Sequence, residues 1–111
     1  MIEIVEVTTT VDSEQAASTL AKQIVAAQLA ACVQIDGPVL SVYRWQGEIC
    51  EAQEWRCTIK TLASASAQLI DFIDENHPYE VPEVLVISVK NSAALYAQWL
   101  ADQVDEATKD V

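Results

Sequence analysis

The sequence is poor in glycine, proline, histidine and positive charge. Two glycines and three prolines among 111 residues exclude a collagen-like or low-complexity chain. Six Lys and Arg stand against 17 Asp and Glu, which gives a formal net charge of −11. Nucleic acid and anionic membrane surfaces both require a positive footprint, so we expect neither as a partner. The negative charge is compatible with cations as partners, although a solvated acidic surface is also common on ordinary proteins.

Long apolar runs are missing as well. The run from Val84 to Val89 is interrupted by Ser88 and is far shorter than the roughly 20 residues of a membrane-spanning helix. The N-terminal segment MIEIVEVTTT has no basic stretch, apolar core or small-residue cleavage site, so we do not expect a secretory signal. In the absence of any targeting segment, the expected compartment is the cytoplasm.

The usual signatures of catalysis and of tight metal binding are also absent. The three cysteines, Cys32, Cys50 and Cys57, are odd in number and lack C-x-x-C spacing, so in a reducing cytoplasm we expect free thiols. No glycine-rich phosphate loop, G-x-S-x-G or H-E-x-x-H motif occurs. Nothing in the sequence brings Glu54, Lys60 and His77 together for acid–base chemistry. The chain is therefore not expected to be an enzyme.

What the sequence does contain is a periodic apolar pattern, with 51% hydrophobic residues, enough for one core and a single domain over residues 1–111. Ala17, Leu20 and Ile24 recur at helical spacing, and Asp12 is placed to cap that helix. The expected elements are a strand at 2–7, a helix at 13–28, strands at 32–35 and 39–45, a strand from 48 to 60, a helix at 63–75, a strand at 84–89 and a last helix that Asn91 or Ser92 caps.

This order, β-α-β-β-α-β-α, predicts an α+β ferredoxin-like sandwich with an additional C-terminal helix. Its sheet is antiparallel, and the first two helices cover one face. The nearly continuous apolar run at 84–89 is typical of a central strand that is buried on both faces. In the last helix, Leu95, Trp99, Leu100 and Val104 are expected to point inward.

A long hairpin is the most unusual expected element. A tight turn at Gln46-Gly47 would place Tyr43 opposite Cys50 and Val39 opposite Glu54. Strands of about a dozen residues would span about 40 Å, more than one small domain covers, so part of the hairpin should pack against another molecule. One face carries Leu40, Val42, Trp55, Cys57 and Ile59 as the expected core, and the other carries Tyr43, Trp45, Glu54 and Lys60. That second face suits either a cleft wall or a protein interface, and we favour the interface.

His77 is the only histidine. Pro78 restricts it to an extended conformation at the end of a predicted helix. Imidazole is a good ligand for copper, so His77 is the best candidate for a metal ligand, with Glu54 or Glu83 as co-ligands. The alternative is a histidine that ends the helix and hydrogen-bonds a nearby carbonyl oxygen.

Several motifs together resemble the CutA divalent-cation-tolerance family. They are Leu29-Ala30-Ala31-Cys32-Val33, Ser41-Val42-Tyr43-Arg44-Trp45-Gln46-Gly47, Lys60-Thr61, His77-Pro78-Tyr79-Glu80-Val81-Pro82-Glu83 and Tyr96-x-x-Trp99. The resemblance implies a ferredoxin-like subunit in a homotrimer, with hairpins that reach across neighbouring subunits. It also implies tolerance of copper and other divalent cations, and weakly bound metal.

Carried over by position, the family's clustered residues are Tyr43, Trp45, Glu54, Lys60, His77, Tyr79 and Glu83. We expect His77 as the metal ligand and the other six as residues that line a cleft. The family's trimer is similar to that of the PII-type regulators. The alternative function is therefore a PII-like regulator that binds a small anionic effector between subunits, through Lys60.

Overall fold

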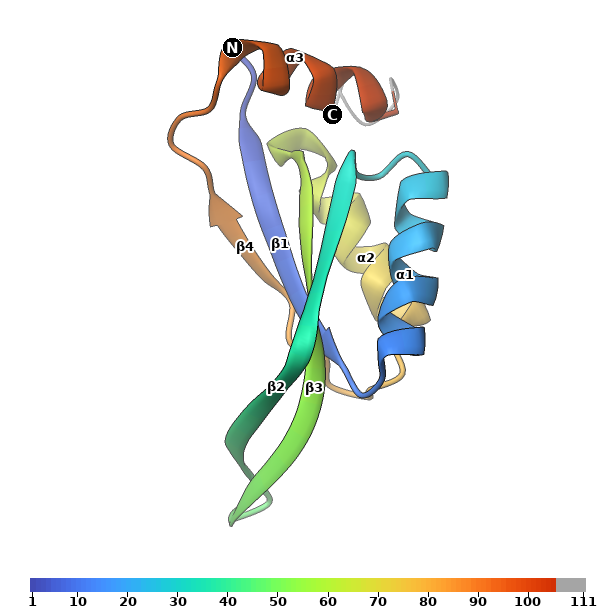
Figure 1. The fold of residues 1–111 in the computed structure, drawn as a ribbon, viewed down its shortest axis with the longest axis vertical. Coiled ribbons are helices and arrows are strands. Elements are labelled where there is room, and N and C mark those ends of the chain that lie inside the picture. The colour runs from blue at the N-terminus through green and yellow to red at the C-terminus, as the bar shows by residue number, and fades with distance from the viewer. Residues whose placement is uncertain (106–111) are drawn as a thin grey trace.

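The computed structural model describes residues 1–105, and it confirms the predicted α+β class and the order of the elements. A four-stranded antiparallel sheet is combined with three α-helices (Figure 1). The elements are β1 (Ile4–Val11), α1 (Glu14–Ala26), β2 (Cys32–Trp45), β3 (Glu48–Leu62), the 3-10 turn η1 (Ala63–Ala65), α2 (Ser66–Asn76), β4 (Leu85–Ser88) and α3 (Ala94–Gln103).

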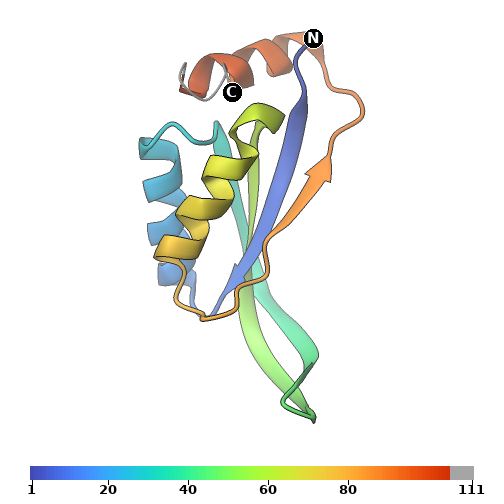
Figure 2. The ribbon, with the colours of Figure 1, turned by 180° about the vertical axis from the view of Figure 1, so that it is seen from behind.

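The strand order in the sheet is β2-β3-β1-β4. Helices α1 and α2 cover one face of this sheet, and the opposite face carries no helix of the described chain (Figures 1 and 2). Helix α3 lies across the end of the sheet at which β1 begins. Among residues 1–105, no helix is long and apolar enough to cross a membrane. The uncovered sheet face is where the candidate site described below is built.

The core lies between the sheet and the first two helices. Ile24 of α1 is fully buried there, as the helical spacing predicts, together with Leu69 and Ile73 of α2 and Ile59 of β3. The cap of α1 differs from the prediction, because Ser13 and not Asp12 accepts the hydrogen bond from the backbone N–H of Ala16, at 3.0 Å. Ser13 has the extended conformation of a capping residue and directly precedes the helix.

Strand β4 corrects one prediction. It pairs only with β1 and lies at an edge of the sheet, not at its centre. Leu85, Val86 and Ile87 are all exposed in the single chain. The error has a topological cause: in this strand order the last strand of the predicted sandwich takes the outer position beside β1, whatever its hydrophobicity. The exposed apolar edge is therefore a surface that the described part of the chain leaves uncovered.

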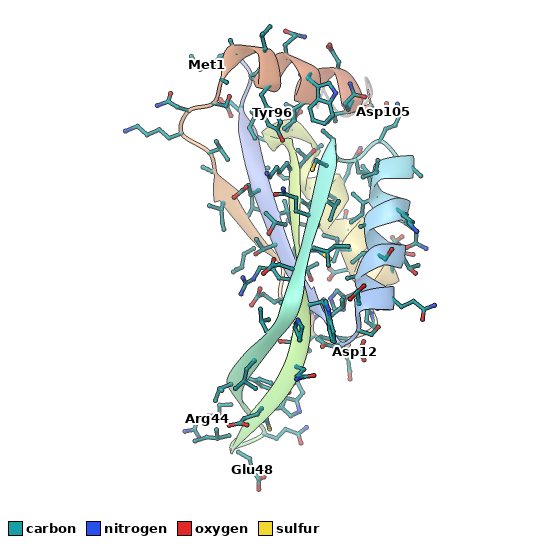
Figure 3. All side chains as sticks on the ribbon, viewed as in Figure 1. Met1, Asp12, Arg44, Glu48, Tyr96 and Asp105 are labelled. Atoms are coloured by element: carbon teal, nitrogen blue, oxygen red, sulfur yellow. The ribbon has the colours of Figure 1, made fainter. Side chains whose placement is uncertain are left out.

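The hairpin of β2 and β3 has the predicted register. Tyr43 faces Cys50 and Val39 faces Glu54, with a β-bulge between Asp36 and Val39. Its outer half projects beyond both helices, and Arg44 and Glu48 mark the tip, far from Asp12 at the start of α1 (Figures 1 and 3). The hairpin is therefore longer than the layer of helices that covers the rest of the sheet.

That extra length corrects the predicted core face of the hairpin. Cys57 and Ile59 are fully buried, as expected. Leu40 and Val42 have the same strand parity, but they are 66% and 59% exposed because they lie past the ends of α1 and α2. Strand alternation thus predicted which face of the hairpin points toward the helices, but it did not predict how far along the hairpin the helices extend.

Helix α3 packs through a narrower stripe than predicted. Leu100 and Val104 are buried against Ile4 and Leu62, as expected. Leu95 and Trp99 were predicted to point inward but are exposed, because only one side of the helix contacts the sheet end. The helix begins after Ala93 without a side-chain cap, so the predicted cap at Asn91 or Ser92 is also wrong.

Candidate functional site

A groove of about 660 Å³ lies where the hairpin leaves the covered part of the sheet. Tyr43 and Trp45 of β2 and Glu54 of β3 line it, together with Tyr79 and Glu83 from the segment between α2 and β4. These five are among the residues that the sequence placed in a cleft. Thr10, Ser41, Val42, Glu80 and Val81 complete the lining; the sequence assigned none of them to the cleft, and it placed Val42 on the core face of the hairpin.

A short hydrogen bond joins the two sides of this groove. The hydroxyl of Tyr79 donates to Glu54 Oε2 at 2.7 Å, and the Glu54 residue is only 8% exposed. Burial and the neighbouring Glu54 carboxylate raise the pKa of Tyr79 well above its ordinary range. The phenol therefore stays protonated and remains a donor, so the bond persists at neutral pH and ties the loop to the hairpin.

His77 holds the same loop onto the end of β1. Its Nε2 lies 2.8 Å from the carbonyl oxygen of Thr10 and 3.1 Å from the hydroxyl of Thr9. Its Nδ1 accepts the backbone N–H of Tyr79 at 3.0 Å. Because a backbone N–H can only donate, Nδ1 is the unprotonated nitrogen and Nε2–H donates to Thr10. Both ring nitrogens are thus engaged, which is the contact pattern of the helix-terminating alternative.

The surroundings of His77 favour its neutral form. Burial lowers the pKa of His77 below its ordinary value of 6.5. The bond to the Thr10 carbonyl and the charges of Asp12, Asp74 and Glu54 oppose this shift but do not cancel it. Because the pKa of His77 is lower in the folded chain, the unfolded chain binds the proton more tightly. Neutral His77 therefore stabilises the fold at pH values above 6.5, and this stabilisation is lost as the pH falls from 6.5 through the folded pKa.

A pH series on His77→Gln tests this coupling. We expect the free energy of unfolding of the wild type to fall more steeply than that of the variant between about pH 7 and pH 5, because protonated Nδ1 cannot accept the Tyr79 N–H. Urea denaturation at each pH measures the difference. The glutamine cannot titrate, but it retains a donor and an acceptor. If the free energy of unfolding fell equally with pH in both proteins, the assignment of His77 as a neutral ring that accepts the Tyr79 N–H would be contradicted.

The described residues do not form a dedicated metal centre. Within 1–105, no group of three or more His, Cys, Asp and Glu side chains is placed to hold an ion. Burial, with a smaller effect from the charge of Asp36, raises the pKa of Cys57 to about 11, so this thiol stays neutral and is a poor ligand. A metal ion on His77 would have to displace a hydrogen bond that the fold already makes.

Lys60 lies away from the groove. In the sheet register it lies opposite Glu6 of β1 and opposite Cys32 of β2. The bulge between Asp36 and Val39 separates this part of the sheet from Tyr43 and Trp45. The groove lining in the described part of the chain contains neither lysine nor arginine. The site is therefore aromatic and anionic, and it offers no positively charged side chain to an anionic ligand.

The three thiols are free, as predicted, with Cys57 buried and Cys32 and Cys50 half-buried. We expect alkylation of the native protein to modify Cys57 last, because it is inaccessible and its pKa is raised to about 11. After unfolding without a reductant, mass spectrometry should find all three cysteines modified. A stable pair of unmodified cysteines would show a disulfide and contradict the observed register.

Comparison with known proteins identifies the family. The profile described as "CutA1 divalent ion tolerance protein" matches residues 5–103, nearly the whole chain. The chain belongs to the CutA1 family. This confirms the resemblance drawn from the motifs, and it connects the groove and the long hairpin to a family named for tolerance of divalent ions.

Two curated relatives illustrate the match. The divalent-cation tolerance protein CutA of Thermus thermophilus is 41% identical over 93 residues, which cover 84% of this chain and 90% of the relative. Human protein CutA is 39% identical over 101 residues, or 91% of this chain. The match covers 56% of the human protein, so the chain spans only about half the length of that relative.

Solved CutA1 structures have the same fold. CutA1 from Oryza sativa superposes with a TM-score of 0.92 at 34% identity, over 95% of this chain and 96% of that one. The structure of an Archaeoglobus fulgidus protein named a periplasmic divalent cation tolerance protein gives 0.89 at 27% identity, over 92% and 99% of the two chains. The fold described above is thus that of the CutA1 family.

Proposed function

We propose that this chain is a non-enzymatic divalent-cation tolerance protein, which acts as a cytoplasmic homotrimer and binds divalent ions, copper among them, weakly. The match to the CutA1 family over residues 5–103 is the observation that carries the proposal. The names of the relatives refer to tolerance of divalent cations, and the chemistry of this chain's surface is compatible with that role.

The cation part of the proposal rests on carboxylates. Glu54, Glu80 and Glu83 line one groove, and the chain carries a formal net charge of −11. Without three converging ligands, such a surface holds divalent ions through oxygen atoms and a diffuse negative field, which salt screens. We therefore infer low affinity and little selectivity. His77 is still the only imidazole that copper could select, at the cost of its present hydrogen bonds.

The trimer part of the proposal rests on apolar surface that residues 1–105 leave uncovered. The hairpin exposes Leu40, Val42, Tyr43, Trp45 and Ile49, and the edge strand β4 and helix α3 add further exposed apolar side chains. Large apolar surfaces of this kind usually mark an interface. Because the hairpin projects beyond its own helices, a neighbouring subunit is the partner that best explains its length (Figure 1).

The non-enzymatic role and the cytoplasmic compartment are supported by His77 and by the three cysteines. The hydroxyl that His77 contacts is that of Thr9, and it lies beside Nε2, the nitrogen that carries the proton donated to Thr10. The ring therefore has no free base position from which to activate that hydroxyl, which supports a non-enzymatic role. The three unpaired thiols favour a reducing cytoplasm, although one structural neighbour is named periplasmic. The PII-like alternative gains no support, since the groove offers no positive charge to an anionic effector.

A thermal-shift panel tests the function. We expect Mg²⁺, Mn²⁺ and Cu²⁺ to raise the melting temperature at millimolar concentration, because a ligand of the native state stabilises it by mass action, and we expect added NaCl to reduce the effect. Nucleotides and other small anions should have no effect. Stabilisation by a nucleotide, with none by the metals, would replace the proposal with the effector-binding alternative.

A further inference from the structure

The hairpin changes direction at its bulge. There, Gly37 and Pro38 of β2 stand opposite the single residue Trp55 of β3. An extra residue of this kind bends the strand that carries it and increases the local twist. Beyond the bulge, residues 39–54 form an arm that turns out of the line of the inner strands (Figures 1 and 2). The direction of this arm therefore depends on how the bulge is held.

The indole ring of Trp55 lies against the backbone of Gly37. A Cβ atom at position 37 would lie 2.7 Å from Trp55 Cδ1, 2.9 Å from Trp55 Cγ and 3.0 Å from the carbonyl oxygen of Glu54. These atoms are the base of the ring and the backbone of β3, so they cannot move aside unless the strand moves with them. Glycine at position 37 is thus what allows β2 to approach β3 so closely at the bulge.

Packing, and not hydrogen bonding, determines where this indole lies. Trp55 is half-buried and packs against the core between the sheet and helices α1 and α2. Its Nε1 is buried and has no acceptor among residues 1–105. A buried donor without an acceptor costs free energy, so the N–H does not favour this position of the ring. The ring is therefore held by the core on one side and by Gly37 on the other.

We propose that Gly37 and Trp55 form an elbow that fixes the direction in which the arm leaves the sheet. The elbow connects the buried core to the part of the hairpin that carries Tyr43 and Trp45. Its consequence for assembly rests on the proposed trimer, because the direction of the arm determines how the arm meets a neighbouring subunit. The contact itself lies within one chain, so it does not depend on what covers the arm.

Sedimentation equilibrium of Gly37→Ala tests the elbow. We expect the subunits to associate about tenfold more weakly than in the wild type, because the added methyl group forces β2 away from Trp55 and turns the arm. The control is Ile24→Ala, which lowers stability through a core side chain of α1, and its folded protein should associate within about twofold of the wild type. Equal weakening in both variants, or none in Gly37→Ala, would overturn the proposal.

A double-mutant cycle shows whether Trp55 is the residue responsible. In urea denaturation, the loss of stability caused by Gly37→Ala should fall to less than about half in a Trp55→Ala background, where only the contact with the Glu54 carbonyl oxygen remains. Gly47→Ala is the matched control, because a Cβ atom there meets nothing within 4 Å, and its effect should be the same in both backgrounds. If the effect of Gly37→Ala is also the same in both, the elbow does not exist.

Trp55→Phe decides the matter if Gly37→Ala or Trp55→Ala does not fold. It keeps an aromatic ring beside Gly37 and removes the buried N–H, so its subunits should associate within about twofold of the wild type. Loss of assembly in Trp55→Phe would contradict a role that rests on packing. A monomeric wild type would overturn the proposed trimer alone, since the cycle measures a contact within one chain and would still test the elbow.

Discussion

A Trp45→Ala variant is expected to lose the trimer and to sediment as smaller species at micromolar concentration. Trp45 is the last residue of β2, opposite Glu48 across the hairpin turn, and it is 50% exposed in the single chain. The outer half of this hairpin projects beyond both helices (Figure 1). Tryptophan side chains that anchor an interface commonly contribute about 2 to 4 kcal/mol to association. Removal of such an anchor from each of three subunits would affect every interface at once.

The matched control is Val25→Ala, which removes an exposed apolar side chain from α1, a helix that covers the other face of the sheet. It should leave the wild-type sedimentation unchanged. If Trp45→Ala and Val25→Ala both sediment as trimers, Trp45 is not an anchor. If the wild type itself is a monomer, the exposed hairpin has some other partner.

Ile24→Ala should produce a large loss of stability. Ile24 is fully buried between the helix and the sheet, and truncation of a buried isoleucine typically costs about 2 to 5 kcal/mol because a cavity remains. The neighbouring Val25→Ala should cost less than about 1 kcal/mol, since that side chain is 43% exposed and alanine is the better helix former. Urea denaturation measures both, and equal losses would show that the helix faces the sheet differently.

Much of the fold could be predicted because it depends on local patterns. The turn at Gln46-Gly47 fixed the hairpin register, and the pairing of Tyr43 with Cys50 followed directly from counting outward. The spacing of Ala17, Leu20 and Ile24 fixed the buried face of α1 in the same way. Such features need only nearest-neighbour geometry, so one sequence suffices.

The errors concern how far a covering layer extends. Leu40, Leu85 and Trp99 are apolar and were assigned to the core, but no element among residues 1–105 covers them. Hydrophobicity shows that a residue avoids water, and it does not show whether its own chain or a partner covers it. The same residues that contradict the single-chain prediction are therefore the ones that support an assembly.

The candidate site could be predicted only in part. Tyr43, Trp45 and Glu54 share a face by strand alternation, so the sequence could group them. The contact of His77 with Thr10 joins residues 67 positions apart, and no local pattern indicates it. Strand parity grouped Lys60 with the site and gave its correct face of the sheet. Parity carries no information on position along the strand, and Lys60 lies on the other side of the bulge at Asp36 from the groove.

Calorimetry with Cu²⁺ on the wild type and on His77→Gln, at physiological ionic strength, tests the central claim most directly. Both nitrogens of His77 are engaged in hydrogen bonds, and residues 1–105 hold no cluster of three metal-binding side chains. We therefore predict weak binding to both proteins, with dissociation constants that differ by less than about twofold and rise with added salt. Tight, stoichiometric binding that His77→Gln abolishes would contradict this account, because it would show that the ring leaves Thr10 and Tyr79 to form a dedicated copper site.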